Sequence, residues 1–194
     1  GNRRPFFGID KFFARELTEG ASCAYSLQKG VGIMERFTPP PGEAERVVEQ
    51  YGDMLYRLCL VALGSRADAE DAVQDTLLRY LQKAPAFASR EHEKAWLIRV
   101  AANRCRDLRR FRLRHPHTGL EEVAGRCAEP GDRAVLEALM SLPEKFRVVL
   151  LLHYVEGYST GQIAPMIGRT PSAVKMRLQK GRKLLEQAYG REEG

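Results

Sequence analysis

The chain has 194 residues, a formal net charge of +6 and a hydrophobic content of 44%. This length suits one or two small domains, and the basic balance is compatible with a nucleic-acid partner without establishing one. No apolar run approaches the roughly 20 residues that a membrane-spanning helix needs, so we expect no membrane insertion. The four cysteines are scattered without a C-x-x-C pair, which argues against a metal site or a disulfide framework and favours a reducing cytoplasm.

Residues 1–42 differ in character from the rest of the chain. They mix Gly, Phe and Pro in weakly periodic order and end in Pro39-Pro40-Pro41-Gly42. They also lack the apolar core and small-residue cleavage site of a secretory signal. We expect an N-terminal extension, disordered or adventitious, with Met34 as a candidate natural start. The alternative is a small partner-binding helix built on Phe6, Phe7, Phe12 and Phe13.

A helical domain is predicted over residues 43–114. Apolar residues recur there at spacings of three and four, which is typical of amphipathic helices, and no strand is indicated. Gly64-Ser65 and Pro85 interrupt the pattern. The interruptions divide it into three helices, at about 43–63, 66–82 and 91–114. Cys59 and Cys105 lie among apolar residues and are expected to be small core residues.

Charge is distributed unevenly over this domain. The second predicted helix carries Asp68, Glu70, Asp71 and Asp75, and no basic residue lies between Ala67 and Leu78. The third helix instead carries a dense series of arginines between Arg99 and Arg114. A surface that is acidic in one place and basic in another suggests two different partners.

Residues 115–132 contain repeated Pro and Gly without a sustained period, which predicts a flexible linker. A second helical domain is predicted over 133–190. Within it, Ser141-Leu142-Pro143-Glu144 indicates the start of a helix, because proline is tolerated in the first turn, and Gly157 indicates its end. The expected fold is therefore all-α, with two small helical domains joined by a flexible linker.

The stretch from Ser159 to Leu185 predicts a helix-turn-helix. Ser159 and Gln162 have the spacing of a capping box, and Gly168 suits the end of the first helix. Thr170 can cap the second helix, with Pro171 at its first position. In this motif the second helix enters the DNA major groove, so the pattern indicates a binding protein rather than an enzyme.

The second helix of the motif sorts into two faces at about 100° per residue. One face is expected to pack on the first helix and holds Val174, Leu178, Gly181 and Leu185. The other face and its flanks would meet DNA, base edges through the N-terminal half and phosphates through the arginines and lysines. The alternative is a basic amphipathic helix whose polar face is simply solvated. Pro165 lies inside the first helix, where we expect a kink or a shortened helix.

Three segments in order resemble one known family. They are DAEDAVQDTLLRYLQ (68–82), AWLIRVAANRCRDLRR (95–110) and the stretch from LPEKF to GRKLL (142–185). Together they resemble a bacterial RNA polymerase sigma factor of the extracytoplasmic-function (ECF) type, within the sigma-70 family. The resemblance covers roughly residues 43–190. It implies a protein that binds core RNA polymerase, recognises and melts promoter DNA, and in this family is often held by an anti-sigma factor.

The resemblance also assigns roles to residues. The 68–82 helix would dock on core polymerase through Asp68, Asp71, Gln74, Asp75 and Leu78. The 95–110 helix would bind the promoter −10 element through Arg99, Asn103, Arg106, Arg109 and Arg110. The loop 84–92 would help to form the pocket for a flipped base, whereas Trp96 is expected in the core. The second helix of the helix-turn-helix and the turn before it would bind the −35 element through Arg169, Ser172, Lys175, Met176, Arg177, Gln179 and Lys180.

Two other classes of function compete with this interpretation. An operator-binding helix-turn-helix regulator would explain 142–185 but not the 68–82 and 95–110 segments. A nuclease or recombinase would need clustered carboxylates for metal or a placed nucleophile. The acids at 68–75 lie away from the basic segment, and the four histidines form no ligand-spaced pair on a helix. We therefore expect no catalytic residue, no metal and no cofactor.

Overall fold

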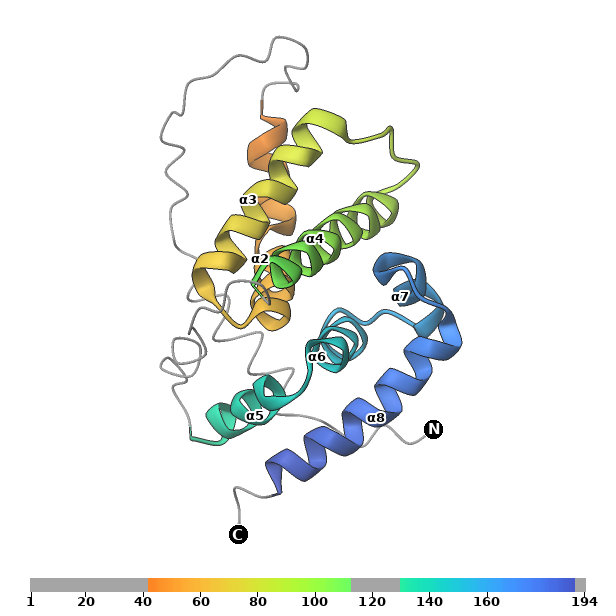
Figure 1. Ribbon diagram of the computed structural model, residues 1–194. Coiled ribbons are helices and arrows are strands. Elements are labelled where there is room, and N and C mark those ends of the chain that lie inside the picture. Colours follow the sequence, from red (N-terminus) through yellow and green to blue (C-terminus); the bar gives the residue numbers. More distant parts are fainter. Residues whose placement is uncertain (1–41, 113–129, 191–194) are drawn as a thin grey trace.

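The computed structural model describes residues 42–112 and 130–190, and these residues are helical, without strands (Figure 1). The N-terminal domain has three helices: α2 (Glu43–Leu63), α3 (Arg66–Lys83) and α4 (Arg90–Arg112). The C-terminal domain contains α5 (Pro130–Ser141), α6 (Glu144–Leu150), the π-helical turn η3 (Leu151–Val155), α7 (Thr160–Ile167) and α8 (Pro171–Tyr189). The all-α, two-domain prediction is confirmed. The predictions for residues 1–41, and for most of the linker, lie outside the described residues.

The N-terminal domain is a bundle in which α2, α3 and α4 contact one another pairwise. Leu55 and Leu58 of α2, Val73 of α3 and Leu97 of α4 are almost completely buried in its core. Gly64 ends α2 with a left-handed backbone (φ 72°), and Ser65 accepts a hydrogen bond from the Asp68 N–H to cap α3. Cys59 and Cys105 are buried, which confirms that they are core residues.

A buried carboxylate fixes the start of α4 against the other two helices. Glu93 is 5% exposed and accepts hydrogen bonds from Arg46 (2.6 Å), from the Tyr51 hydroxyl (2.7 Å) and from the Tyr80 hydroxyl. Burial alone would raise the pKa of Glu93, but these donors outweigh it and lower the pKa to about 2. The charged form of Glu93 is thus part of the folded domain.

The C-terminal domain is built around α8, which contacts α5, α6 and α7. Gly181 allows α8 to approach α6 closely, because a Cβ at this position would lie 3.3 Å from Leu150 Cδ1 and 3.4 Å from Phe146 Cβ. The first helix, α5, begins at Pro130, so its first turn lies inside the range 115–132 that the sequence assigned to the linker. The Pro130-Gly131 pair indicates a break, yet proline is compatible with the first turn of a helix.

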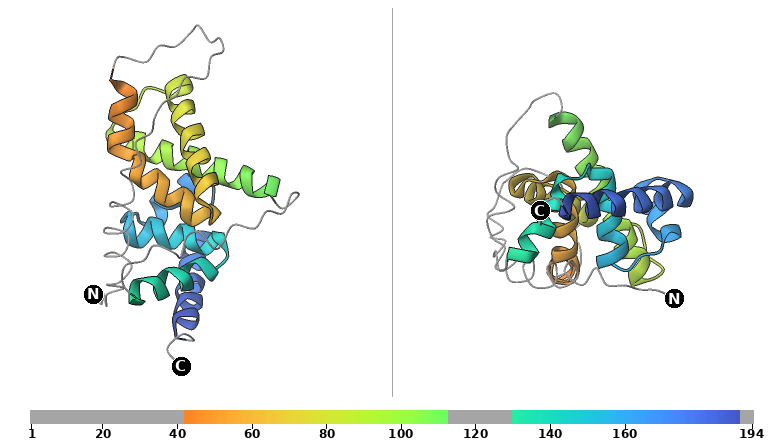
Figure 2. Two further views of the ribbon diagram at one scale, coloured as in Figure 1. Left: turned by 90° about the vertical axis from the view of Figure 1, so that its left-hand side faces the viewer. Right: turned by 90° about the horizontal axis from the view of Figure 1, so that it is seen from below.

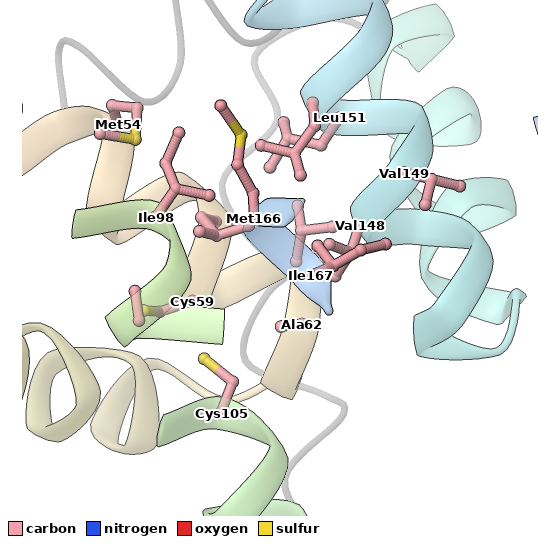
Figure 3. Packing of buried hydrophobic residues seen from close by; sticks show 14 of the residues in the cluster. Met54, Cys59, Ala62, Ile98, Cys105, Val148, Val149, Leu151, Met166 and Ile167 are labelled. Carbon is pink, nitrogen blue, oxygen red and sulfur yellow. The ribbon is translucent and has the colours of Figure 1, made fainter. Parts of the chain in front are cut away.

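The two domains do not stand apart. Figure 2 shows the helices of the N-terminal domain stacked on those of the C-terminal domain, and α2 contacts α6 while α4 contacts α7. Their buried side chains form one continuous hydrophobic cluster, in which Met166 and Ile167 of α7 lie among residues of α2, α4 and α6 (Figure 3). The sequence predicted two modules linked only by a tether, and this packing was not anticipated. We call it the closed arrangement.

Candidate functional site

The helix-turn-helix is present with the caps that the sequence predicted. The Gln162 N–H donates to Ser159 Oγ and the Ser159 N–H donates to Gln162 Oε1 (3.0 Å), which completes the capping box. Gly168 ends α7 in the left-handed conformation (φ 63°), and Thr170 accepts from the Ala173 N–H. Helix α7 runs from Thr160 to Ile167 with Pro165 inside it, so of the two expected outcomes, a kink or a shortened helix, the shortening did not occur and the kink stays a prediction.

The two predicted faces of α8 are also confirmed. Val174, Leu178, Gly181 and Leu185 are its buried residues. On the opposite side, Met176 is 70% exposed although it is apolar. An exposed methionine flanked by polar groups is free to make an apolar contact with a partner. The other exposed candidates in the turn and the N-terminal half of α8 are Arg169, Ser172, Lys175, Gln179 and Lys180, while Arg177 is half-buried.

The acidic helix α3 presents only part of its predicted face. Asp71 and Gln74 are exposed, and Leu78 is 52% exposed beside them. Asp68 lies in the first turn of α3, where the positive end of the helix dipole stabilises a carboxylate. Asp75 forms an ion pair of 2.5 Å with Arg104 of α4. The structure therefore gives Asp75 a role between α3 and α4 that the sequence did not suggest.

The basic helix α4 is divided between free and engaged side chains. Arg99 is exposed, whereas the side-chain oxygen of Asn103 accepts a hydrogen bond from Arg106 (3.1 Å). Arg106 also donates to the Ile167 carbonyl at the end of α7 (3.1 Å), and Arg109 pairs with Glu144 of α6 (2.5 Å). In the closed arrangement two of the predicted phosphate-binding arginines are thus engaged across the domain contact. Arg110 lies 3.9 Å from Asp107 of the same helix.

A cleft of about 660 Å³ lies where α3 ends and α4 begins. The loop between the helices lines it with Phe87 and Ser89, and Tyr80 and Arg90 come from the helices themselves. Tyr80 stacks on Phe87 with ring centroids 6.0 Å apart. Trp96 packs edge-on against Tyr80 and Phe87 and is partly buried against the core, as its apolar neighbours predicted. That Tyr80 and Phe87 line this cleft was not predicted from the sequence, because their pairing depends on how α3 and the following loop pack together.

Several residues at the domain contact had no signal in the sequence. Glu156 pairs with Arg57 (3.1 Å) and with Lys94 (3.3 Å), both in the N-terminal domain. Burial would lower the pKa of Lys94, but Glu156 and Tyr158 outweigh it and raise the pKa. Arg147 is 8% exposed and donates to the Ala62 carbonyl in the last turn of α2 (3.3 Å). A cation is favourable at that end of a helix.

The described ranges hold neither a metal-binding cluster nor a helix that could cross a membrane. Residues 42–112 and 130–190 contain no group of three or more His, Cys, Asp or Glu side chains arranged to hold a metal ion. The helices in the same ranges include none with the length and apolar character to span a membrane.

This geometry defines a two-domain helical protein that ends in a DNA-binding helix-turn-helix. The chain matches the family model of sigma-70 region 2 over residues 47–115 and that of sigma-70 region 4 over residues 132–185. It is 31% identical over 150 residues to the ECF RNA polymerase sigma factor SigM of Mycobacterium tuberculosis, a match that covers 75% of this chain and 76% of SigM. It is also 29% identical over 160 residues to SigW of Bacillus subtilis, covering 72% of this chain and 84% of SigW.

Solved structures agree on the fold. The sigma factor RpoE in complex with the anti-sigma factor NepR from Bartonella quintana superposes with a TM-score of 0.60 at 20% identity, covering 76% of this chain and 96% of RpoE. CnrH, in complex with the cytosolic domain of CnrY, gives a TM-score of 0.55 at 26% identity, covering 74% of this chain and 85% of CnrH. The chain belongs to the sigma-70 family, as an ECF RNA polymerase sigma factor. It binds RNA polymerase and directs promoter recognition, and an operator-binding regulator is not favoured.

Proposed function

We propose that this sigma factor works through three separate surfaces, one on each of α3, α4 and α8. Core polymerase would bind α3, the promoter −10 element would bind α4 and the cleft at its start, and the −35 element would bind α8. The observation that carries the proposal is the division of α8. Its buried stripe faces the domain core while Ser172, Lys175, Met176 and Gln179 are exposed on its N-terminal half.

The −35 surface has base-reading groups and phosphate-binding groups at different places. Gln179 can form paired hydrogen bonds with a base edge, and the exposed Met176 can contact a thymine methyl group. Arg169, Arg177 and Lys180 are suited to phosphates, which set the register of the helix on the duplex without reading sequence. Lys175 lies at the boundary between the two groups.

The −10 surface would act on a base that has left the stack. Arg99 is an exposed cation of α4, and Asn103, four residues further along, offers an amide for a base edge. The cleft at the start of α4 is lined by Phe87, which is less buried than Tyr80 and would be the aromatic contact for an extruded base. Its charged lining consists of Arg46 and Arg90 with the carboxylates Glu43 and Glu93, so the cations for DNA would come mainly from α4. The phosphates of the DNA backbone would be bound by Arg106, Arg109 and Arg110. Arg106 and Arg109 contact the C-terminal domain in the closed arrangement, so they could do this only once the domains separate.

The polymerase surface combines charge with an apolar anchor. Asp71 and Gln74 offer a polar, acidic face, which mainly speeds encounter and sets orientation. Leu78 is the exposed apolar residue beside them and supplies area to bury. Asp68 would contribute charge from the first turn, and Asp75 would contribute after exchanging its partner Arg104.

We infer that the protein is not an enzyme and that it acts in the cytoplasm, where bacterial polymerase works. The solved relatives RpoE and CnrH are bound to an anti-sigma factor and to the cytosolic domain of CnrY, respectively. By extension, an anti-sigma factor is a proposed partner of this chain.

Selection of promoters from a random library with this protein and core polymerase tests the proposal. We expect two conserved blocks upstream of the start site, and Gln179→Ala should relax the sequence preference of the upstream block only. The loss per base contact should be about 1–3 kcal/mol. Gln187→Ala, an exposed glutamine near the end of the same helix, is the matched control. If Gln179→Ala leaves the selected sequences unchanged, the assignment of α8 is wrong.

A further inference from the structure

A second cleft, of about 290 Å³, lies between the two domains. Helices α2 and α4 line it from the N-terminal domain, and α6, the end of α7, the turn before α8, and α8 line it from the C-terminal domain. Apolar side chains such as Leu58, Ala62 and Val149 contribute to its lining. The charged lining residues are six cations and one carboxylate, Glu144: the cations are Arg106, Arg109, Arg110, Lys145, Arg169 and Arg177. We call this the basic cleft.

Among the described residues, carboxylates pair with only two of the six cations of the basic cleft, Arg109 and Arg110. Glu144 is already paired with Arg109. Arg106 donates to the uncharged Asn103 side chain and the Ile167 carbonyl, and Arg169 donates to the Gly168 carbonyl (3.0 Å). Within the described parts of the chain, no carboxylate forms an ion pair with Arg106, Arg169 or Arg177.

Arg177 of α8 is half-buried at the basic cleft, close to the other cations. Burial, and then the nearby Arg169 with a contribution from Arg106, lowers the pKa of Arg177, while Glu144 opposes the change. A lowered pKa means that the closed arrangement disfavours the charge on this guanidinium. An anion placed in the cleft would reverse that effect.

We propose that the basic cleft binds a compact anion with two or more adjacent phosphate groups, which bridges α4 and α8 and stabilises the closed arrangement. Guanidinium groups bind phosphate through two parallel hydrogen bonds. Arg106 of α4, Arg169 of the turn before α8 and Arg177 of α8 line the cleft from three different elements. The volume lies at the small end of the range for ligand pockets, which suits a pyrophosphate group and excludes a duplex.

The bound anion would have a consequence for DNA. Arg106 and Arg109 belong to the proposed −10 surface, and Arg169 and Arg177 belong to the proposed −35 surface. A ligand that binds only the closed arrangement shifts the population toward it. Because the same arginines would have to bind promoter DNA, the ligand should lower the affinity for promoter DNA, and promoter DNA should lower the affinity for the ligand by the same factor. This consequence depends on the proposed function, whereas anion binding itself does not.

Calorimetric titration of the full chain with pyrophosphate, at constant ionic strength and without DNA or polymerase, tests the binding. We expect saturable binding at one site that is tighter than binding of inorganic phosphate or sulfate. Arg177→Gln should weaken it about tenfold, the usual loss for a charged hydrogen bond. Arg169→Gln, at an exposed position, should do the same without affecting folding. Arg79→Gln removes an equal charge from exposed α3 and should leave the affinity unchanged.

Two further comparisons sharpen the outcome. Glu156→Gln lies outside the basic cleft but loosens the domain contact, so it should also weaken pyrophosphate binding if the ligand bridges the domains. A nucleoside diphosphate that binds more tightly than pyrophosphate would identify a nucleotide as the ligand, and equal affinities would identify the phosphate groups alone. The proposal is overturned by unsaturable binding, by equal losses in Arg177→Gln and Arg79→Gln, or by a Glu156→Gln variant that binds as wild type does.

Discussion

Arg57 of α2 and Glu156, which follows η3, are 99 positions apart in the chain and form an ion pair of 3.1 Å across the domain contact. Lys94 of α4 joins the same carboxylate, whose side chain is only 8% exposed. The segment that carries Glu156 turns inward because the Tyr158 N–H donates to the Leu152 carbonyl (2.9 Å) and Gly157 has a positive φ of 76°. One carboxylate of the C-terminal domain thus binds two helices of the N-terminal domain.

Replacement of Glu156 should loosen the closed arrangement. Glu156→Gln leaves Arg57 and Lys94 without their carboxylate at a largely buried contact. The free energy of unfolding should fall by about 2 kcal/mol, less than for a fully buried pair because both cations keep some solvent. Urea unfolding measures the change, with Glu186→Gln on the exposed face of α8 as the control. Equal stability of the two variants would mean that the pair contributes nothing.

Because Glu93 is buried and charged, we expect the free energy of unfolding to fall at acidic pH. Its pKa in the folded protein is about 2, below the ordinary value of 4.5, so the folded state binds this proton less readily than the unfolded chain. The stabilisation is fully present above pH 4.5 and is lost as the pH falls toward 2. Glu93→Gln should cost about 2 kcal/mol at neutral pH, since three donors lose a charged acceptor.

The difference in unfolding free energy between wild type and Glu93→Gln, followed from pH 7 to pH 2, checks this prediction. It should shrink across that acidic interval and stay constant above it. Glu91→Gln, at an exposed position in the same turn, should show no such trend. A gap that persists unchanged at pH 2 would contradict the role of the Glu93 charge.

The close contact between α8 and α6 limits the size of the side chain that position 181 can carry. Gly181→Ala adds a Cβ that lies 3.3–3.4 Å from Leu150 and Phe146, and the gain in helix propensity of about 1 kcal/mol offsets this crowding. Gly181→Leu cannot be accommodated in the same way and should destabilise the protein by roughly 1–3 kcal/mol. Thermal unfolding of both variants distinguishes the two effects. A Gly181→Leu protein as stable as wild type would show that α8 can move away from α6.

Substitutions on α3 and on α4 should affect different activities, namely binding to core polymerase and opening of the −10 element. Asp71→Lys with Leu78→Ala should weaken binding to core polymerase without changing the sequence of the promoters that are opened. Arg99→Ala with Asn103→Ala should impair −10 opening and leave core binding intact. Binding is measured by competition for core enzyme, and opening by permanganate reactivity of the −10 thymines. The reverse pattern, or loss of both activities in both double variants, would exclude this division.

Sequence reasoning located the helices and their ends because those depend on neighbours in the chain. The Ser159–Gln162 capping box, the left-handed Gly168 and the buried stripe of α8 each involve residues within a few positions of one another. Periodicity and caps act at this range, so they are visible in one sequence. The order of the three segments 68–82, 95–110 and 142–185 was then enough to indicate the sigma-70 family.

The sequence could not show how the two domains meet. Arg106 on the Ile167 carbonyl, Arg147 on the Ala62 carbonyl and Glu156 between Arg57 and Lys94 join positions 61 to 99 apart. A charged residue on a helix has the same local pattern whether its partner is water, a phosphate or a distant carbonyl. Only the tertiary structure places Arg106 and Arg109, which we propose for the −10 surface, against the helix-turn-helix domain, because burial and charge pairing at this contact depend on both domains at once.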